Sequence, residues 1–232
     1  PCSPSNPADY PVLSQERLRL MLITGSSPSA PRSILSIVQS ALEAGAPAIQ
    51  LRAKKARARD MAELGRRLRE LTKAADALLL VNDRYDVARA VAADGVHLGP
   101  EDVPVSALRR IAPKGFLIGA SADQPSAAQR LVSEGADYIG CGAIYPTLNK
   151  LDAGPTIGLA GLQAVVDAVE VPVLGIGGID ADGARKIATR TSAAGIAAIG
   201  SIMDADDPGS EVSALLSPFR TYDYKGAANR PT

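Results

Sequence analysis

In Leu78-Leu79-Leu80-Val81-Asn82-Asp83, four apolar residues are followed directly by an amide and a carboxylate. A strand of a parallel sheet that is covered by helices is a continuous apolar run, so this stretch predicts a buried parallel strand with a polar carboxyl end. Five further runs have the same design and end in polar residues or glycines, at 48–52, 95–99, 117–121, 138–144 and 171–178. Such strand ends meet on one rim of a closed barrel, where barrel active sites are built. We therefore expect an enzyme.

Helical periodicity separates these runs. Apolar residues recur at spacings of three and four between them, as in Met61, Leu64, Leu68 and Leu71, which predicts amphipathic helices. Such stretches lie near 34–42, 61–71, 84–93, 105–111, 126–134, 159–169, 181–191 and 211–219. The runs 20–24 and 196–200 complete a set of eight strands, each followed by a helix. The order favours the α/β class and a (β/α)8 TIM barrel over an open doubly wound sheet.

The barrel is expected to be a single domain over residues 20–220. Residues 1–19 are polar and rich in proline near their start, and they predict a mobile N-terminal lead-in. Residues 221–232 predict a C-terminal tail for the same reason. The chain has no Gly-x-Gly-x-x-Gly and no Gly-x4-Gly-Lys-Ser/Thr, so neither a dinucleotide site nor a P-loop is expected.

Composition narrows the class of partner. Hydrophobic residues make up 46% of the 232 residues, aromatic residues 3%, and Trp is absent, so the core must be aliphatic. Lys+Arg and Asp+Glu are equal at 25 each, which predicts no attraction to nucleic acid or a membrane surface. Two cysteines and one histidine exclude a His-rich metal cage and fit a reduced, cytoplasmic setting. Small-molecule substrates are the expected partners, and a homo-oligomer stays open.

The second strand end carries cations. Gln50, Arg52 and Lys54 alternate at or just past the run 48–52, which places them on one side, toward the barrel mouth. Arg offers a bidentate fork and Lys a point charge, the pair suited to a phosphate or pyrophosphate. The alternative is the solvated start of the next, very basic helix.

Carboxylates follow the third and fourth strands. Asn82 and Asp83 end one run, and Asp102 comes shortly after the next. Mg2+ typically takes one or two carboxylates together with substrate phosphates, so Asp83 and Asp102 are candidate metal ligands. The alternative is that each aspartate caps the helix that follows it.

Hydroxyl and amide donors lie at the fifth and sixth strand ends. Ser121 ends one run, and Thr147, Asn149 and Lys150 follow the next, as donors suited to phosphate oxygens or, alternatively, as an ordinary loop. The single histidine, His97, predicts a satisfied core residue, with a rim contact to substrate as the other interpretation. No base partner is expected for Ser121, which argues against a nucleophilic triad.

Glycines follow the last two strands. Gly177-Gly178 and Gly200-Ser201 fall in the loops where TIM barrels bind phosphate through backbone N–H groups, although a tight turn is the plain alternative. Two anion-binding sites, one rich in glycine and one built from cationic side chains, would then face each other across the mouth of the barrel. That arrangement predicts the joining of a monophosphate to a fragment that leaves as pyrophosphate.

The ordered set of motifs resembles the thiamine phosphate synthase family. The resemblance rests on stretches that run in order from about residue 20 to 208, at 50–54, 81–84, 93–102, 118–121, 135–147 with Lys150, and 173–179. It implies coupling of an aminopyrimidine methyl pyrophosphate with hydroxyethylthiazole phosphate. Three departures are Asn149 for a threonine, Ala143 for a proline, and Gly200 where the family often has serine.

The resemblance also implies roles. Mg2+ would be held by Asp83 and Asp102, and the pyrophosphate charge would be neutralised by Arg52, Lys54 and Lys150. The pyrimidine would be oriented by Gln50, Asn82 and Ser121, and the thiazole phosphate held by Gly177, Gly178, Gly200 and Ser201. Two rivals are a thiazole tautomerase, whose histidine after the fifth strand is Asp123 here, and a catalytically silent binding barrel.

Overall fold

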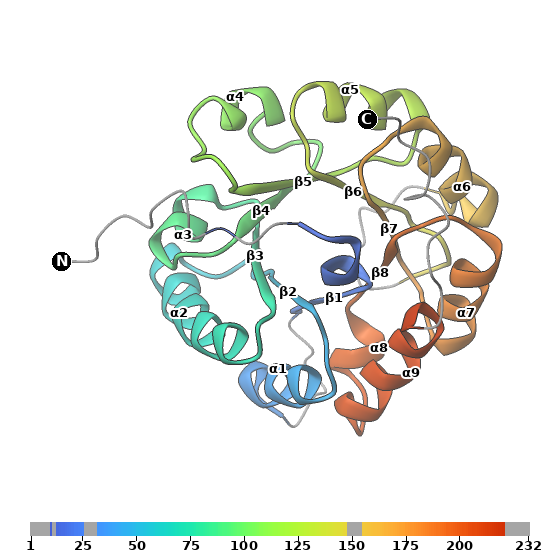
Figure 1. Cartoon of the computed structure of the whole chain (residues 1–232). Coiled ribbons are helices and arrows are strands. Elements are labelled where there is room, and N and C mark those ends of the chain that lie inside the picture. Colours follow the sequence, from blue (N-terminus) through green and yellow to red (C-terminus); the bar gives the residue numbers. More distant parts are fainter. Residues whose placement is uncertain (1–9, 11–12, 26–31, 148–154, 221–232) are drawn as a thin grey trace.

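The protein is a closed eight-stranded parallel barrel. The computed structural model describes residue 10 and residues 13–25, 32–147 and 155–220. The strands pair in chain order and the last closes on the first, as Figure 1 shows along the barrel axis. They are β1 (Leu20–Ile23), β2 (Ala48–Leu51), β3 (Leu78–Asn82), β4 (Gly95–Leu98), β5 (Leu117–Ser121), β6 (Tyr138–Cys141), β7 (Val173–Ile176) and β8 (Gly195–Ala198). The predicted (β/α)8 TIM barrel is confirmed.

Helices surround the barrel (Figure 1). They are α1 (Ile34–Glu43), α2 (Ala58–Ala74), α3 (Tyr85–Ala90), α4 (Val105–Arg109), α5 (Pro125–Ser133), α6 (Gly158–Ala168), α7 (Ala181–Arg190), α8 (Gly200–Met203) and α9 (Pro208–Arg220). Of these, α8 is a short helix that the sequence pattern did not predict, because the expected strand 196–200 ends at Ala198 and the chain turns helical at Gly200. None of the described helices is long and apolar enough to cross a membrane.

The alternation of each strand supplies two separate cores. On β3, Leu78 and Leu80 belong to the cluster inside the barrel, whereas Leu79 and Val81 belong to the cluster between the strands and the helices. Successive residues of a strand point to opposite faces, so a continuous apolar run fills both cores at once. This is why the strands read as unbroken runs in the sequence.

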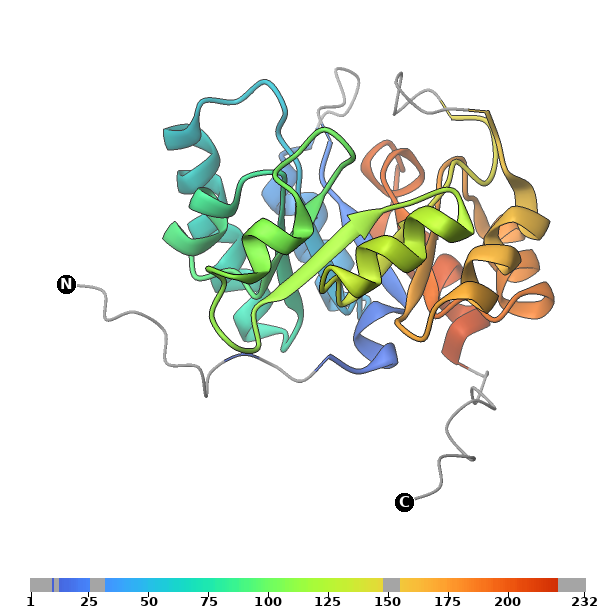
Figure 2. The same cartoon turned by 90° about the horizontal axis from the view of Figure 1, so that it is seen from above.

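The base of the barrel is closed by the chain that precedes β1. Residues Gln15–Leu18 form a 3-10 helix, η2, and Leu18 is fully buried in the interior cluster. Tyr10 packs edge-on against Phe116. The described part of the predicted lead-in 1–19 therefore packs on the barrel, and the tail 221–232 lies outside the described residues. Figure 2 shows η2 at the lower end, opposite the end toward which the strand arrows point.

Candidate active site

A pocket opens at the carboxyl ends of the strands. Its volume is about 280 Å³, and it is lined by residues that lie in each of the eight strands or directly after them. Nearly all the described residues that the sequence assigned to substrate are in its wall: Gln50, Arg52, Asn82, Ser121, Thr147, Gly177, Gly178, Gly200 and Ser201. Lys54 lies outside this wall, and Asn149 and Lys150 lie outside the described residues.

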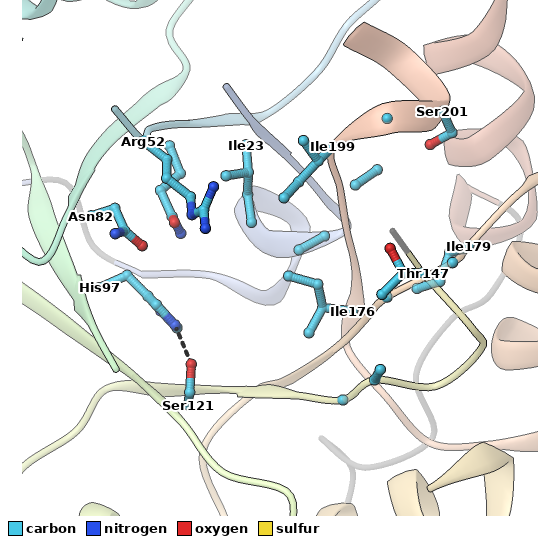
Figure 3. A pocket seen from close by; sticks show the side chains of 18 of the residues that line it. Ile23, Arg52, Asn82, His97, Ser121, Thr147, Ile176, Ile179, Ile199 and Ser201 are labelled. Carbon is cyan, nitrogen blue, oxygen red and sulfur yellow. Dashed lines mark hydrogen bonds between the residues drawn. The ribbon is translucent and has the colours of Figure 1, made fainter. Parts of the chain in front are cut away.

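The pocket has two polar sides with an apolar middle. Figure 3 shows Arg52, Asn82, His97 and Ser121 on one side and Thr147 and Ser201 on the other. The side chains of Ile176, Ile199 and Ile23 lie between the two groups. These isoleucines come from the ends of β7, β8 and β1, and the sequence reasoning did not assign them to the site. The shape accommodates a flat apolar ligand with a polar group at each end.

Thr24 holds the backbone of Arg52. The hydroxyl of Thr24 accepts a hydrogen bond from the Arg52 N–H at 2.9 Å and donates to the Arg52 carbonyl at 3.2 Å. Thr24 is fully buried, so this pair of bonds fixes where the chain leaves β2 and where the guanidinium enters the pocket. Below Arg52, the Gln50 amide donates to the sulfur of Met21 at 3.2 Å.

Asp83 and Asp102 form a pair of carboxyl groups at the β3 and β4 ends. Burial and the hydrogen-bonded, negatively charged Asp102 raise the pKa of Asp83 to about 6, while Lys54 and Arg52 act in the opposite direction. Neither aspartate caps a helix: α3 follows Arg84 and α4 follows Pro104, neither with a side-chain cap, and Asp102 instead accepts the Gly99 N–H at 2.6 Å.

The two carboxyl groups fit a hard cation that is completed by a ligand. The part of the chain that the structure describes holds no cluster of three or more Asp, Glu, His or Cys side chains able to bind a metal ion. Mg2+ often needs only one or two carboxylates, because substrate phosphates and water supply the other oxygens. A carboxyl group whose pKa is raised by a neighbouring carboxyl group, as that of Asp83 is, is in an electrostatic situation that such a cation relieves.

His97 lies inside the barrel between two hydroxyl groups. Its Nδ1 is 3.0 Å from the Tyr138 hydroxyl, and its Nε2 is 3.0 Å from the Ser121 hydroxyl. No base partner was expected for Ser121, yet the register of β4 and β5 brings the only histidine of the chain within hydrogen-bond distance of it, with donor and acceptor set by the tautomer of His97. His97 is both a hydrogen-bonded interior residue and part of the pocket wall. Tyr138, beneath it, was missed in the sequence.

The loop after β7 needs glycine. Gly177 and Gly178 have φ of +103° and +62°, which other residues rarely adopt. A Cβ on Gly178 would lie 2.3 Å from the Pro146 carbonyl oxygen, so the loop packs directly on the backbone after β6. Asp180, which also lines the pocket, accepts the Gly183 N–H at 2.7 Å and caps α7.

Known proteins share this combination of fold and residues. A family model described as thiamine monophosphate synthase matches residues 20–202. The chain is also 42% identical over 211 residues to the thiamine-phosphate synthase of Roseiflexus castenholzii, which covers 91% of each chain. The chain belongs to the thiamine monophosphate synthase family. It is thus an enzyme, a transferase.

Further relatives of this synthase family agree. The thiamine-phosphate synthase of Pyrococcus furiosus is 49% identical over 170 residues, which are 73% of this chain and 81% of that one. A solved structure of thiamine phosphate pyrophosphorylase from Pyrococcus furiosus matches with a TM-score of 0.80 and 42% identity, over 89% of this chain and 97% of that one. The ordered motifs of the strand ends were sufficient to find the family.

Two of the three departures from the synthase motifs are visible in the structure. Ala143 lines the pocket after β6. It follows Gly142, where an added Cβ would lie 2.0 Å from the Ile176 carbonyl oxygen. Gly200 begins α8, and Ser201 lines the pocket one position later. The shift keeps a hydroxyl group on the β8 side of the pocket (Figure 3).

Proposed function

We propose that this enzyme couples 4-amino-2-methyl-5-hydroxymethylpyrimidine pyrophosphate with hydroxyethylthiazole phosphate and releases thiamine phosphate and pyrophosphate. The observation that carries the proposal is the pocket with two polar sides and an apolar middle. Two flat rings, each with a phosphate group at its outer end, match that pattern. The reacting atoms would meet over the apolar middle.

The cationic side is suited to the pyrophosphate. Arg52 and Lys54 lie near enough to Asp83 to lower its pKa, so the charges of the two cations and the two carboxyl groups share one region of the rim. In the proposed reaction the bond from the pyrimidine methylene carbon to the pyrophosphate oxygen breaks, and the electron pair leaves with the pyrophosphate. Arg52, Lys54 and Lys150 would neutralise that developing charge. The role of Lys150 stays a prediction, because this residue lies outside the described part of the chain.

Asp83 and Asp102 would hold Mg2+. The ion, when bound, would neutralise charge on the pyrophosphate oxygens and so favour departure of this group. Asp102 is oriented for this by the Gly99 N–H, which holds its Oδ2 at 2.6 Å. The positive φ of Asp83, +63°, aims its carboxyl group in a direction that an ordinary strand end would not give.

The remaining pocket residues would position the two rings. Gln50, Asn82 and Ser121 would orient the pyrimidine, and the thiazole nitrogen would then form the new bond to the methylene carbon. Backbone N–H groups near Gly177, Gly178, Gly200 and Ser201 would hold the thiazole phosphate, with Thr147 and Asn149 as further donors. This role is supported by the position of Gly200 and Ser201, which begin α8 and line the pocket.

The test follows both products. The protein is incubated with the two substrates and Mg2+, and pyrophosphate and thiamine phosphate are measured together. Equal amounts of both are expected, with loss in EDTA and a decrease of roughly 100-fold or more in Asp83→Asn, because one phosphate-side interaction of the transition state is removed. Asn is chosen because it tolerates the positive φ of Asp83.

The matched control is Asp86→Asn. Asp86 is three residues away in the first turn of α3, is 64% exposed and pairs with Arg84, so its variant should keep full activity. Absence of thiamine phosphate from a folded sample that binds the thiazole phosphate would overturn the proposal. A thiazole tautomerase or a silent binding barrel would then be the remaining candidates.

A further inference from the structure

A hydrogen-bonded chain of three side chains runs from the barrel interior to the pocket. The Tyr138 hydroxyl is 3.0 Å from Nδ1 of His97, and Nε2 of His97 is 3.0 Å from Oγ of Ser121. Figure 3 shows the second of these bonds, with Ser121 at the pocket wall. Because the three residues come from β6, β4 and β5, the barrel itself sets their spacing.

Two interior glycines make room for this chain. A Cβ on Gly119 would lie 2.0 Å from Cζ of Tyr138, so the phenol ring occupies the place of a side chain on β5. A Cβ on Gly140 would lie 3.0 Å from Cε1 of His97. Strand glycines in a barrel interior mark a close approach of another group. Here the close groups are the two rings of the chain.

The direction of the hydrogen bonds follows from the Tyr138 hydroxyl. Tyr138 is 1% exposed, and among the described residues the hydrogen-bond partner of its hydroxyl is Nδ1 of His97. A buried hydroxyl that donates to nothing carries a large desolvation cost, so its proton must point at that nitrogen. Burial raises the pKa of Tyr138 well above its usual range, so the phenol keeps the proton that it donates.

We propose that Tyr138 is a positioning residue that fixes His97 as the Nε2–H tautomer, so that Ser121 presents its own proton to the pocket. A nitrogen that accepts from Tyr138 carries no hydrogen, so the imidazole proton is on Nε2 and is donated to Oγ of Ser121. Ser121, already an acceptor, then has its O–H free to donate to a ligand. The pocket therefore recognises an acceptor atom at this point.

The ligand acceptor is a ring nitrogen with a lone pair, an assignment that rests on the proposed function. An aminopyrimidine offers such nitrogens, and Ser121 lies on the polar side where that ring would bind. A site whose donor is fixed rejects a ligand that brings another donor, because two hydrogens would then face each other. The chain from Tyr138 would thus act on selection of the ring and not on the pyrophosphate.

The first experiment measures the tautomer directly. His97 is the only histidine of the chain, so protein labelled with 15N-histidine gives one set of ring signals. The free enzyme is expected to show a proton on Nε2 and none on Nδ1. In Tyr138→Phe, which removes only the hydroxyl, a mixture of both tautomers is expected. A proton on Nδ1 in the wild type, or an unchanged tautomer in the variant, would overturn the proposal.

The second experiment measures kinetics. In Tyr138→Phe, kcat/KM for the pyrimidine pyrophosphate is expected to fall about 5- to 10-fold, the worth of one hydrogen bond between neutral groups, with KM for the thiazole phosphate unchanged. Tyr145→Phe is the matched control, because the Tyr145 hydroxyl is buried and has no hydrogen-bond partner among the described residues. Equal effects of the two variants would contradict the proposal.

The two readouts separate this proposal from the proposed function. The tautomer of His97 is measured without substrate, so the role of Tyr138 in fixing it can be tested even where no thiamine phosphate is formed. Should Tyr138→Phe fail to fold, the wild-type ring signals alone decide, because a proton on Nδ1 excludes donation from Tyr138.

Discussion

Asp83 shows how a single residue can oppose stability for the sake of binding. Its carboxyl group is half-buried beside Asp102, and both burial and that neighbour raise its pKa from 3.8 to about 6. Its backbone has φ of +63°, a conformation that costs free energy for most residues. Strain and repulsion gathered at one rim position are typical of a site that is completed by a ligand.

The pH dependence of unfolding reports this repulsion. The pKa of Asp83 is higher in the folded state than in the unfolded one, so the folded state binds the proton more tightly. The contribution of this proton to the free energy of unfolding is fully present below about pH 4 and is lost as pH rises through about 6. Asp83→Asn removes this loss. In EDTA at pH 7 we expect the variant to exceed the wild type by about 1 kcal/mol in the free energy of unfolding, a value discounted for the exposed part of the group.

Urea titrations at pH 4 and pH 7 measure this difference. The gain from Asp83→Asn should be present at pH 7 and nearly absent at pH 4. Mg2+ should stabilise the wild type and leave the variant unchanged, since the ion binds the ionised carboxyl group. A variant that is less stable than the wild type at pH 7 would contradict the cause assigned to the raised pKa.

At the scale of residues, the sequence predicted the kinds of side chain at the rim but not their partners. Arg52 and Ser121 were found because polar residues at the ends of apolar runs are conspicuous. Thr24 and Tyr138 were missed because their partners lie 28 and 41 residues away in the sequence. Such pairs depend on the register between strands, which a one-dimensional pattern does not contain.

The elements that carry the site are loops whose backbone leaves no room for side chains. The β7–α7 loop passes the end of β6 so closely that a Cβ at Gly178 would contact both the Pro146 carbonyl oxygen, at 2.3 Å, and Cβ of Tyr145, at 2.9 Å. Backbone atoms of two connected strands cannot move apart cheaply. The same closeness is what lets a phosphate approach the backbone N–H groups.

Gly178→Ala tests this loop against Gly158→Ala. The two glycines have nearly equal φ, +62° and +64°, but nothing lies within 4 Å of a Cβ at Gly158. Gly158→Ala should lower the free energy of unfolding by about 1 kcal/mol, which is strain alone. Gly178→Ala should cost roughly 3 kcal/mol and raise KM for the thiazole phosphate, because the loop must shift. Thermal unfolding and initial rates measure both effects, and equal costs would refute the packing argument.

Element boundaries followed local chemistry where it was decisive. Ser33 caps α1, accepting the Ser36 N–H at 3.2 Å, and Gly45 and Gly135 have positive φ directly after α1 and α5. Gly195 also follows a helix, α7, but it is the first residue of β8, where a Cβ would lie 2.2 Å from the Leu18 carbonyl oxygen. A glycine pattern alone cannot separate a helix end from a close crossing of two chains.

At the scale of the whole molecule, the two ends of the barrel have different tasks. The strands' carboxyl ends carry the pocket, whereas the opposite end is closed by η2 and the buried Leu18. The repeated alternation of strand and helix made the barrel predictable from sequence. The closing segment was not predictable, because its polar composition resembles a free terminus and its one buried leucine has no periodic neighbours.

Leu18→Ala separates these two tasks. Removing a fully buried side chain from the interior cluster should lower the free energy of unfolding by about 3 kcal/mol, because it leaves a cavity that the stiff barrel does not fill. Since Leu18 lies at the end opposite the pocket, kcat/KM at 25 °C should stay within about twofold. Ile176→Ala, in the pocket wall, should show the reverse balance, with a weaker effect on unfolding and a higher KM. Urea unfolding and initial rates on both variants decide this, and a large loss of activity in a folded Leu18→Ala would mean that the base and the mouth are coupled.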